Sequence, residues 1–150
     1  METDDLQNVS IEEIIRIERF CARLATDSTR HIDARRNEEW SNLFAEDAEL
    51  YAKGTVHLGR AAVLAYAQGT PSELATFHSI SYLHIDVISE TEAHGEIGMI
   101  AFVVPIKDGM AQAPELSPAV IGKYIDIYRK YGEGWRIAQR KFVPHMYRTA

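Results

Sequence analysis

The sequence is poor in several features that mark particular classes of protein. It contains a single cysteine, Cys21, so an internal disulfide is excluded and a reducing compartment is expected. No stretch approaches the roughly 20 consecutive apolar residues that a membrane-spanning helix requires. The first residues, METDD, lack the positive region of a signal peptide. We therefore expect a cytoplasmic protein that has no membrane partner.

Positive charge is also scarce. The chain has 16 Lys and Arg residues against 22 Asp and Glu residues, which gives a formal net charge of -6. The densest basic stretch is the pair Arg35–Arg36, and Glu38 and Glu39 follow it at once. Because binding to nucleic acid depends on clustered Lys and Arg side chains that displace counterions from phosphates, we expect no nucleic-acid partner.

What is present is typical of one globular domain: 150 residues, 46% of them hydrophobic and 25% charged. We expect a flexible polar tail over residues 1–9 and a single domain over residues 10–150. Ser10 and Glu13 form a capping box at the start of a helix whose apolar residues keep a helical period to Leu24. Cys21 lies on this helix, where a small buried hydrophobe is a better interpretation than a reactive thiol.

The helical pattern then weakens over residues 26–36, which predicts either a bent continuation or a second short helix. Further helices are predicted from residue 37 to 44 or 45 and over residues 59–69, the second closed by Gly69. Two short strands, 47–51 and 55–58, flank the turn Lys53–Gly54. Four long segments rich in β-branched and aromatic residues follow, at 77–89, 95–106, 119–131 and 134–147.

The order of these segments predicts an α+β fold, because the helices come mostly first and the long strands last. The short connections favour antiparallel neighbours, since parallel pairs need crossovers of a dozen or more residues. The segment 97–104 is apolar on both of its faces. We therefore expect a homodimer or homotrimer that forms through the sheet, with cover by a loop as the alternative.

Two segments contain the main candidate residues for chemistry. Asp33 lies between helical stretches, where it is either a helix cap or a functional carboxylate. His78 enters the first long strand, and a period of two places it on one face with Tyr82 and His84. A carboxylate that holds one imidazole nitrogen leaves the other free as a general base. Asp33 and His78 are therefore candidate catalytic residues.

Other polar and aromatic residues are candidates to surround a ligand. Tyr124 and Asp126 share one side of the third long strand, and Tyr124 or Tyr82 could donate to a developing oxyanion. Arg140, on the same side of the fourth long strand as Arg136 and Ala138, could balance the charge of a leaving group or of Asp126. The remaining candidate substrate-binding residues are aromatic: Trp40, Tyr51 and Phe102.

Neither a metal nor a cofactor is expected. The six histidines show no zinc-binding spacing and have no cysteine partners. His78 and His84 are roughly 20 Å apart on an extended strand, which is too far for one ion. The sequence also has no glycine-rich phosphate-binding motif and no nucleophile elbow.

In their order and spacing these residues resemble a SnoaL-like domain of the NTF2-like superfamily, over about residues 10–147. The resemblance rests on five motifs: Asp33-x6-Trp40-x3-Phe44 continuing to Leu50, Gly59–Ala62, Thr76-x-His78, Gly122-x-Tyr124-x-Asp126-x-Tyr128, and Gly134–Ile137 with Arg140. It implies a cone in which N-terminal helices close over a strongly curved, mainly antiparallel sheet around a deep hydrophobic pocket.

Within this superfamily the chain resembles scytalone dehydratase and hexachlorocyclohexane dehydrochlorinase. The resemblance implies that His78 takes a proton from the substrate, that Asp33 orients His78, and that Arg140 assists the leaving group. It further implies elimination without metal or cofactor. Those relatives usually have Asn four residues after the histidine, a position that Tyr82 holds here.

The leading prediction is a cofactor-free lyase or isomerase, dehydratase-like, that acts on a small, mostly apolar, cyclic substrate. One alternative is a polyketide cyclase or ketosteroid-isomerase-like enzyme with Asp126 as the base, whose activity would survive His78→Ala. The other is a non-catalytic protein, which either binds a small ligand or resembles the structural small subunit of ring-hydroxylating dioxygenases. The subunit alternative predicts a larger obligate partner.

Overall fold

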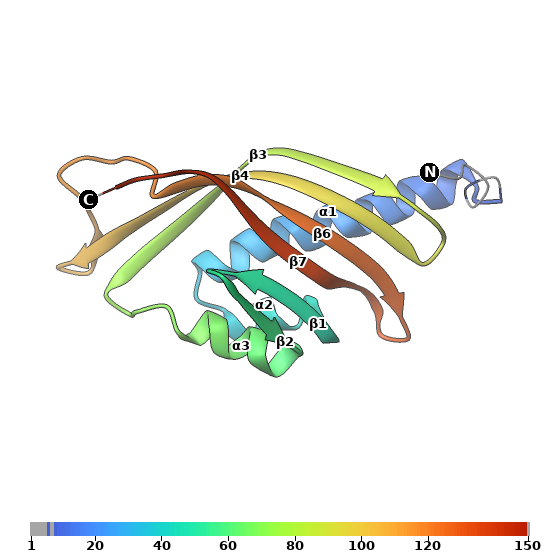
Figure 1. Cartoon of the computed structure of the whole chain (residues 1–150), viewed down its shortest axis with the longest axis horizontal. Helices are drawn as coiled ribbons and strands as arrows, with labels where there is room; N and C mark the ends of the chain where they lie inside the picture. Colours follow the sequence, from blue (N-terminus) through green and yellow to red (C-terminus); the bar gives the residue numbers. More distant parts are fainter. Residues whose placement is uncertain (1–5, 7, 150) are drawn as a thin grey trace.

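The structure is a computed structural model that describes residue 6 and residues 8–149, and most of the predicted tail therefore lies outside the described residues. The chain folds as α+β (Figure 1), as the sequence predicts. In order, its elements are α1 (Ile11–Asp33), α2 (Asn37–Ser41), β1 (Phe44–Ala52), β2 (Thr55–Leu58), α3 (Arg60–Gln68), β3 (Leu74–Val87), β4 (Glu92–Lys107), β5 (Met110–Ala111), β6 (Val120–Tyr131) and β7 (Gly134–Tyr147).

Helix α1 is one uninterrupted helix rather than a helix followed by a bent or separate piece. The backbone N–H of Glu13 donates to the Ser10 side chain at 3.1 Å, so the Ser10 half of the predicted capping box is present, while the Glu13 carboxylate pairs with Arg16 at 3.1 Å. The polar stretch in the second half is held by Asp27, which pairs with Arg23 at 3.7 Å and with Arg30 at 2.7 Å. Such pairs, three and four residues apart, favour the helical conformation where the apolar pattern fades.

The long strands form one sheet in the order β2-β1-β7-β6-β4-β3, with β5 paired to β4. All pairs are antiparallel except β1 with β7, which are parallel and are joined by most of the chain. Helix α1 packs mainly on β3. Figure 1 shows α2, α3 and the β1–β2 hairpin gathered near the C-terminal end of α1.

Besides an irregular pairing of β1 with β7 between Phe44 and Glu49, β-bulges in β3 and β7 change which face of a strand points inward. Ser81 is the extra residue of β3 opposite β4, while Ala138 and His145 are the extra residues of β7 opposite β6. Each bulge reverses the alternation of side chains beyond it. The bulge at Ser81 fits against Gly98 of β4, where an added Cβ would stand 2.2 Å from the ring of Tyr82.

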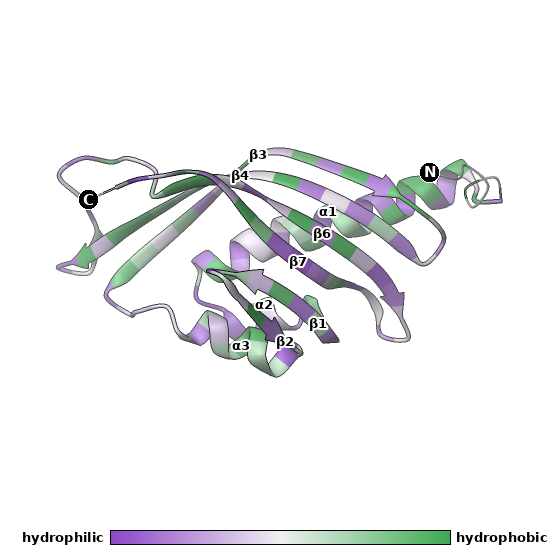
Figure 2. Ribbon diagram, in the orientation of Figure 1, coloured by the Kyte–Doolittle hydropathy of each residue, from purple (hydrophilic) through white to green (hydrophobic). Residues whose placement is uncertain are grey.

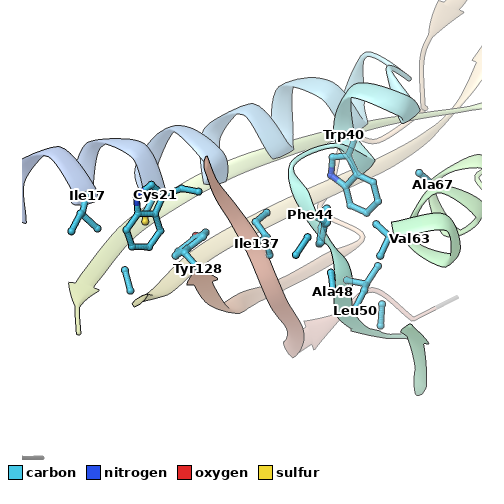
Figure 3. Packing of buried hydrophobic residues seen from close by; sticks show 14 of the residues in the cluster. Ile17, Cys21, Trp40, Phe44, Ala48, Leu50, Val63, Ala67, Tyr128 and Ile137 are labelled. Carbon is cyan, nitrogen blue, oxygen red and sulfur yellow. The ribbon is translucent and has the colours of Figure 1, made fainter. Parts of the chain in front are cut away.

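The core joins the inner face of α1 to the sheet and continues under α2 and α3. Ile17 and Cys21 of α1 are fully buried, and Figure 3 shows them on the same side of the helix as Tyr128 and Ile137. Trp40 and Phe44 continue the core, with ring centroids 4.8 Å apart. Figure 2 shows hydrophobic and hydrophilic segments alternating along the long strands, as expected where one face covers a core.

The end of one predicted helix differs in the structure. The predicted helix from residue 37 ends at Ser41, and Phe44 already begins β1, because the backbone N–H of Ile137 in β7 donates to Leu43 and draws the chain into the sheet. Among the described residues, no helix combines the length and the apolar character needed to cross a membrane.

Candidate active site

A cavity of about 570 Å³ lies between the helices and the inner face of the sheet. Its size is that of a site for a small ligand. Every long element contributes to its wall, which is mainly apolar with a few polar groups; the residues used below are Ser28, Arg35, Trp40, Lys53, Thr55, His57, Tyr66, Thr76, His78, Tyr124 and Arg140.

Asp33 is the last residue of α1, and its carboxylate is held by β3. Its Oδ2 accepts from the backbone N–H of His78 at 2.7 Å, and its Oδ1 accepts from the Thr76 hydroxyl at 3.1 Å. It does not cap the start of a helix, since α2 begins after Arg36. A negative charge at the C-terminal end of a helix is unfavourable, and these hydrogen bonds offset that cost. A residue so mismatched to its helix is a mark of a functional position.

The imidazole of His78 completes the contact. Its Nδ1 lies 2.6 Å from Asp33 Oδ1, and both side chains are mostly buried, at 15% and 17% exposed. An ionised carboxylate can only accept, so Nδ1 carries the proton and Nε2 of the neutral ring keeps its lone pair. Nε2 has no hydrogen-bond partner among the described residues, and His78 lines the cavity. The nitrogen that Asp33 leaves free therefore belongs to a residue of the cavity wall.

Arg35 ties together the two segments that carry this pair. Its φ of 58° is in the left-handed region, which a side chain other than glycine rarely adopts. From there its guanidinium donates to the carbonyl oxygens of Thr70 (2.8 Å), Pro71 (2.6 Å) and Leu74. The end of α1 is thereby fixed to the loop that leads into β3.

A second polar group lies at the base of the cavity around Arg140, which is only 2% exposed. Its Nε and Nη2 donate to the two oxygens of Asp126 at 2.8 and 2.7 Å, and Nη1 donates to Ser28. Tyr128 donates to the same carboxylate at 2.7 Å, and Trp40 donates to Ser28 at 3.2 Å. Burial lowers the pKa of Arg140, but its ion pair with Asp126 reverses this, so the net pKa is raised and the guanidinium stays charged.

Two tyrosines, Tyr66 and Tyr124, line the cavity. The ring of Tyr124 lies under the guanidinium of Arg140, 4.4 Å from Cζ to the ring centroid. Burial raises the pKa of Tyr124 to about 12, although the nearby Arg140 lowers it. Burial also raises the pKa of Tyr66. Neither hydroxyl has a hydrogen-bond partner among the described residues, so both remain neutral donors for a ligand.

Of the nine residues proposed from the sequence, four line the cavity together: Trp40, His78, Tyr124 and Arg140. Asp33 stands directly behind His78. Asp126 is fully buried behind Arg140, with both of its oxygens occupied, and is not in the cavity wall. The structure thus places Asp126 where it holds Arg140, and not in the cavity wall.

Three other candidate substrate-binding residues also lie outside the cavity wall. The bulge at Ser81 turns Tyr82 outward, where it is 47% exposed and donates to Glu96 at 3.0 Å. Tyr51 faces away from the cavity and donates to Glu49 at 2.9 Å. Phe102 lies on the outer face of β4, opposite Phe77, while its neighbours Ala101 and Val103 line the cavity.

The bulge at Ala138 corrects a further expectation. It places Arg140 on the same side of β7 as the buried Trp135 and Ile137, rather than with Arg136. Strict alternation could not show this, because the extra residue is visible only in the pairing of β7 with β6.

The structure adds residues that the sequence did not suggest. Arg35 and Ser28 were unremarkable in a polar stretch, and Tyr66 matched the apolar period of α3. Their roles depend on contacts with segments far away in the chain, which the sequence does not show. The left-handed backbone conformation of Arg35 is a local feature, but no sequence pattern marks it. Among the described residues, no three His, Cys, Asp or Glu side chains are arranged to hold a metal ion.

Comparisons with known proteins agree with this architecture. A model of the SnoaL-like domain family matches residues 13–141. A solved structure from Novosphingobium aromaticivorans, provisionally named scytalone dehydratase, is 27% identical; the match covers 91% of this chain and 89% of that one, with a TM-score of 0.77. No curated protein matches the chain.

Two more distant structures share the fold. An NTF2-like protein with a cystatin-like fold, also from Novosphingobium aromaticivorans, is 20% identical with a TM-score of 0.70, over 94% of this chain and 90% of that one. A type 2 hexachlorocyclohexane dehydrochlorinase is 16% identical with a TM-score of 0.71, over 89% of this chain and 91% of that one. The fold is therefore NTF2-like, as the resemblance in the sequence implied.

Proposed function

The chain belongs to the family of SnoaL-like domains, and from that premise we propose that it is a cofactor-free lyase or isomerase that removes a proton from a carbon atom of its substrate. The base is His78, and Asp33 orients it. The observation that supports this most strongly is the 2.6 Å contact between His78 Nδ1 and Asp33 Oδ1, combined with the position of His78 in the cavity wall.

The pair is suited to proton transfer for a simple electrostatic reason. When Nε2 accepts a proton, the imidazole becomes a cation, and the carboxylate of Asp33 stabilises that cation. The backbone N–H of His78 and the hydroxyl of Thr76 keep the carboxylate in place. Little reorganisation is therefore needed during the reaction, which is the condition under which electrostatic stabilisation is most effective.

The electron pair of the broken C–H bond needs an acceptor. In an elimination it forms a carbon–carbon double bond while the leaving group departs with its bonding electrons. In an isomerisation it moves to a carbonyl oxygen, and the proton returns from His78 to another carbon. Tyr124 donates a hydrogen bond to the leaving group or the oxygen anion, and the adjacent Arg140 strengthens this donor, because its charge acts to lower the pKa of Tyr124.

The wall of the cavity indicates the kind of substrate. Apolar groups from α3, β4 and β7 face the rings of Trp40, Tyr66 and Tyr124. A mostly apolar, cyclic molecule fits such a wall, since rings pack on aromatic faces and displace water. The alternative in which Asp126 is the base is not favoured, because both of its carboxylate oxygens are engaged behind Arg140.

The experiment is a turnover screen of cyclic alcohols, ketones and halides with matched histidine variants. His78→Asn should lower the rate by about 10²–10⁴-fold, the usual contribution of a positioned general base. His84→Asn is the control, because His84 on the same strand also contacts a carboxylate, Asp86 at 3.0 Å, but is 67% exposed. If His78→Asn converts a substrate of the wild type at the full rate, the proposal is overturned. It is also overturned if the wild type binds these compounds but converts none of them.

A further inference from the structure

The cavity differs in charge from the rest of the molecule. Acidic residues outnumber basic ones in the chain, 22 to 16, yet the cavity wall contains no Asp or Glu among the described residues. It does contain three permanent cations, Arg35, Lys53 and Arg140, together with His57 and His78. A cavity lined by one sign of charge raises the local concentration of ligands of the opposite sign.

The three cations are not equally available to a ligand. Arg140 is neutralised by Asp126 at 2.7 Å. Arg35 has its guanidinium occupied by three backbone carbonyl oxygens. Lys53 makes no ion pair with a described residue, and its ammonium lies 5.7 Å from the centre of the Tyr66 ring. Lys53 is therefore the cation of the wall that a ligand can still pair with.

Other donors accompany Lys53 on the β1–β2 hairpin. Lys53 lies in the turn with a φ of 52°, and Thr55, two residues later, begins β2. His57 follows, paired with Leu50 of β1, and its ring centroid lies 4.9 Å from that of Tyr66. All three side chains contribute to the cavity wall. Lys53 and Thr55 are exposed, so these donors form a rim at one end of the cavity.

We propose that the substrate carries a carboxylate, and that this group binds to Lys53, Thr55 and His57 while the reacting carbon lies at His78. This inference rests on the proposed function and names the substrate class of the same site. A carboxylate matches the ammonium, hydroxyl and imidazole donors of the rim through charge-assisted hydrogen bonds. The apolar ring of the substrate then extends past Tyr66 into the cavity.

The test compares carboxylates with their uncharged amides by isothermal titration calorimetry. Naphthoate with naphthamide, and cyclohexanecarboxylate with its amide, are suitable probe pairs, because each pair keeps the same ring and nearly the same shape while the amide has no charge and replaces one acceptor oxygen with an NH2 donor. We expect at least one carboxylate to bind roughly tenfold more tightly than its amide, as for a charge-assisted contact at a partly enclosed site. The preference should weaken as salt is added.

Variants locate this preference on the hairpin. Lys53→Gln should remove most of it, His57→Gln should reduce it, and Lys53→Arg should keep it. Lys130→Gln is the matched control, because Lys130 is an exposed residue of β6 that does not line the cavity. The proposal is overturned if no carboxylate binds more tightly than its amide, or if the preference survives Lys53→Gln unchanged.

The two proposals fail in different ways, because this binding measurement requires no turnover. If turnover depends on His78 but carboxylates have no advantage over amides, only the substrate class is wrong. If carboxylates bind through Lys53 but the turnover of a converted substrate does not depend on His78, only the proposed base is wrong.

Discussion

At the scale of single residues, the polar groups of the cavity are held by partners that are in place before any ligand arrives. Asp33 accepts from Thr76 and from both the backbone and the ring of His78. Arg140 is fixed by both oxygens of Asp126 and by Ser28. Such preorganisation keeps donors and bases in the geometry that a transition state needs.

The pair of Arg140 and Asp126 should be important for stability as well as for the site. Asp126→Asn leaves the buried guanidinium without its counter-charge, so we expect the free energy of unfolding to fall by about 3–5 kcal/mol. In the double variant Asp126→Asn with Arg140→Gln, neither charge is left unpaired. Urea denaturation should then show a loss smaller than the sum of the two single losses, whereas strictly additive losses would contradict the coupling.

Cys21 should make stability depend on pH in the alkaline range. Burial, with a further contribution from Asp126, raises the pKa of its thiol from 9.0 to about 12. Above about pH 9 the unfolded chain therefore loses this proton while the folded chain keeps it, and stability falls as the pH rises. Between pH 9 and pH 10 this ionisation should lower the free energy of unfolding of the wild type by up to about 1 kcal/mol. Cys21→Ala should lack this part of the pH dependence when both proteins are compared by urea denaturation.

The control for Cys21 is the same comparison near pH 7, where neither state ionises the thiol. There the difference between wild type and Cys21→Ala should not change with pH. A thiol in the folded protein that reacts readily with iodoacetamide near pH 8 would contradict the account, because the reactive form is the thiolate.

At the scale of elements, the site depends on how the end of α1 is attached to the start of β3. Arg35 makes that attachment through three carbonyl oxygens, and Asp33 makes it through β3 itself. Arg35→Ala should therefore loosen the loop at residues 70–74 and speed hydrogen exchange at the amides of Leu74 and His78 by about tenfold or more.

Conservative replacement should not restore the attachment. Arg35→Lys keeps the charge but cannot reach three carbonyl oxygens with one planar group, so its exchange rates should resemble those of Arg35→Ala. Arg36→Ala is the control, since it truncates the neighbouring arginine without breaking a hydrogen bond between described residues. Unchanged exchange in Arg35→Ala would show that the three contacts do not hold the loop.

The elements themselves could be predicted from the sequence wherever a local pattern specifies them. The cap at Ser10, the hairpin around Lys53–Gly54 and the helix before Gly69 are all found, because each depends on neighbours in the chain. The contact of Asp33 with His78 could be inferred only through family resemblance.

Features set by pairing across the sheet could not be predicted. The extra residue at Ser81 moves Tyr82 to the outer face, and no property of residues 77–87 alone requires a bulge there. The same is true of Ala138 in β7. Arg35 was missed for a related reason, because its role is defined by carbonyl oxygens some 35 to 39 positions away.

At the scale of the whole molecule, the outer face of the sheet leaves apolar side chains exposed. Phe77 is 62% exposed and pairs across the sheet with Phe102, while Ile125 is 41% exposed. The association of copies through the sheet, as a homodimer or homotrimer, stays a prediction. We expect light scattering to show an oligomer for the wild type and a monomer for Phe77→Glu with Ile125→Glu.

The control for association is Ile11→Glu, which adds a charge at an exposed apolar residue at the start of α1, away from the outer face of the sheet. It should leave the oligomer intact. A wild-type protein that is monomeric across the concentrations measured would contradict association through this face.

Removal of a proton from carbon by His78 can be measured as hydrogen–deuterium exchange into a substrate. The protein is incubated in deuterium oxide with a panel of cyclic ketones, and deuterium in the recovered ketone is measured by mass spectrometry. If His78 is the base, exchange should fall by about 10²–10⁴-fold in His78→Asn, fall less in Asp33→Asn, and stay unchanged in His84→Asn. Equal exchange in His78→Asn and the wild type would show that His78 is not the base.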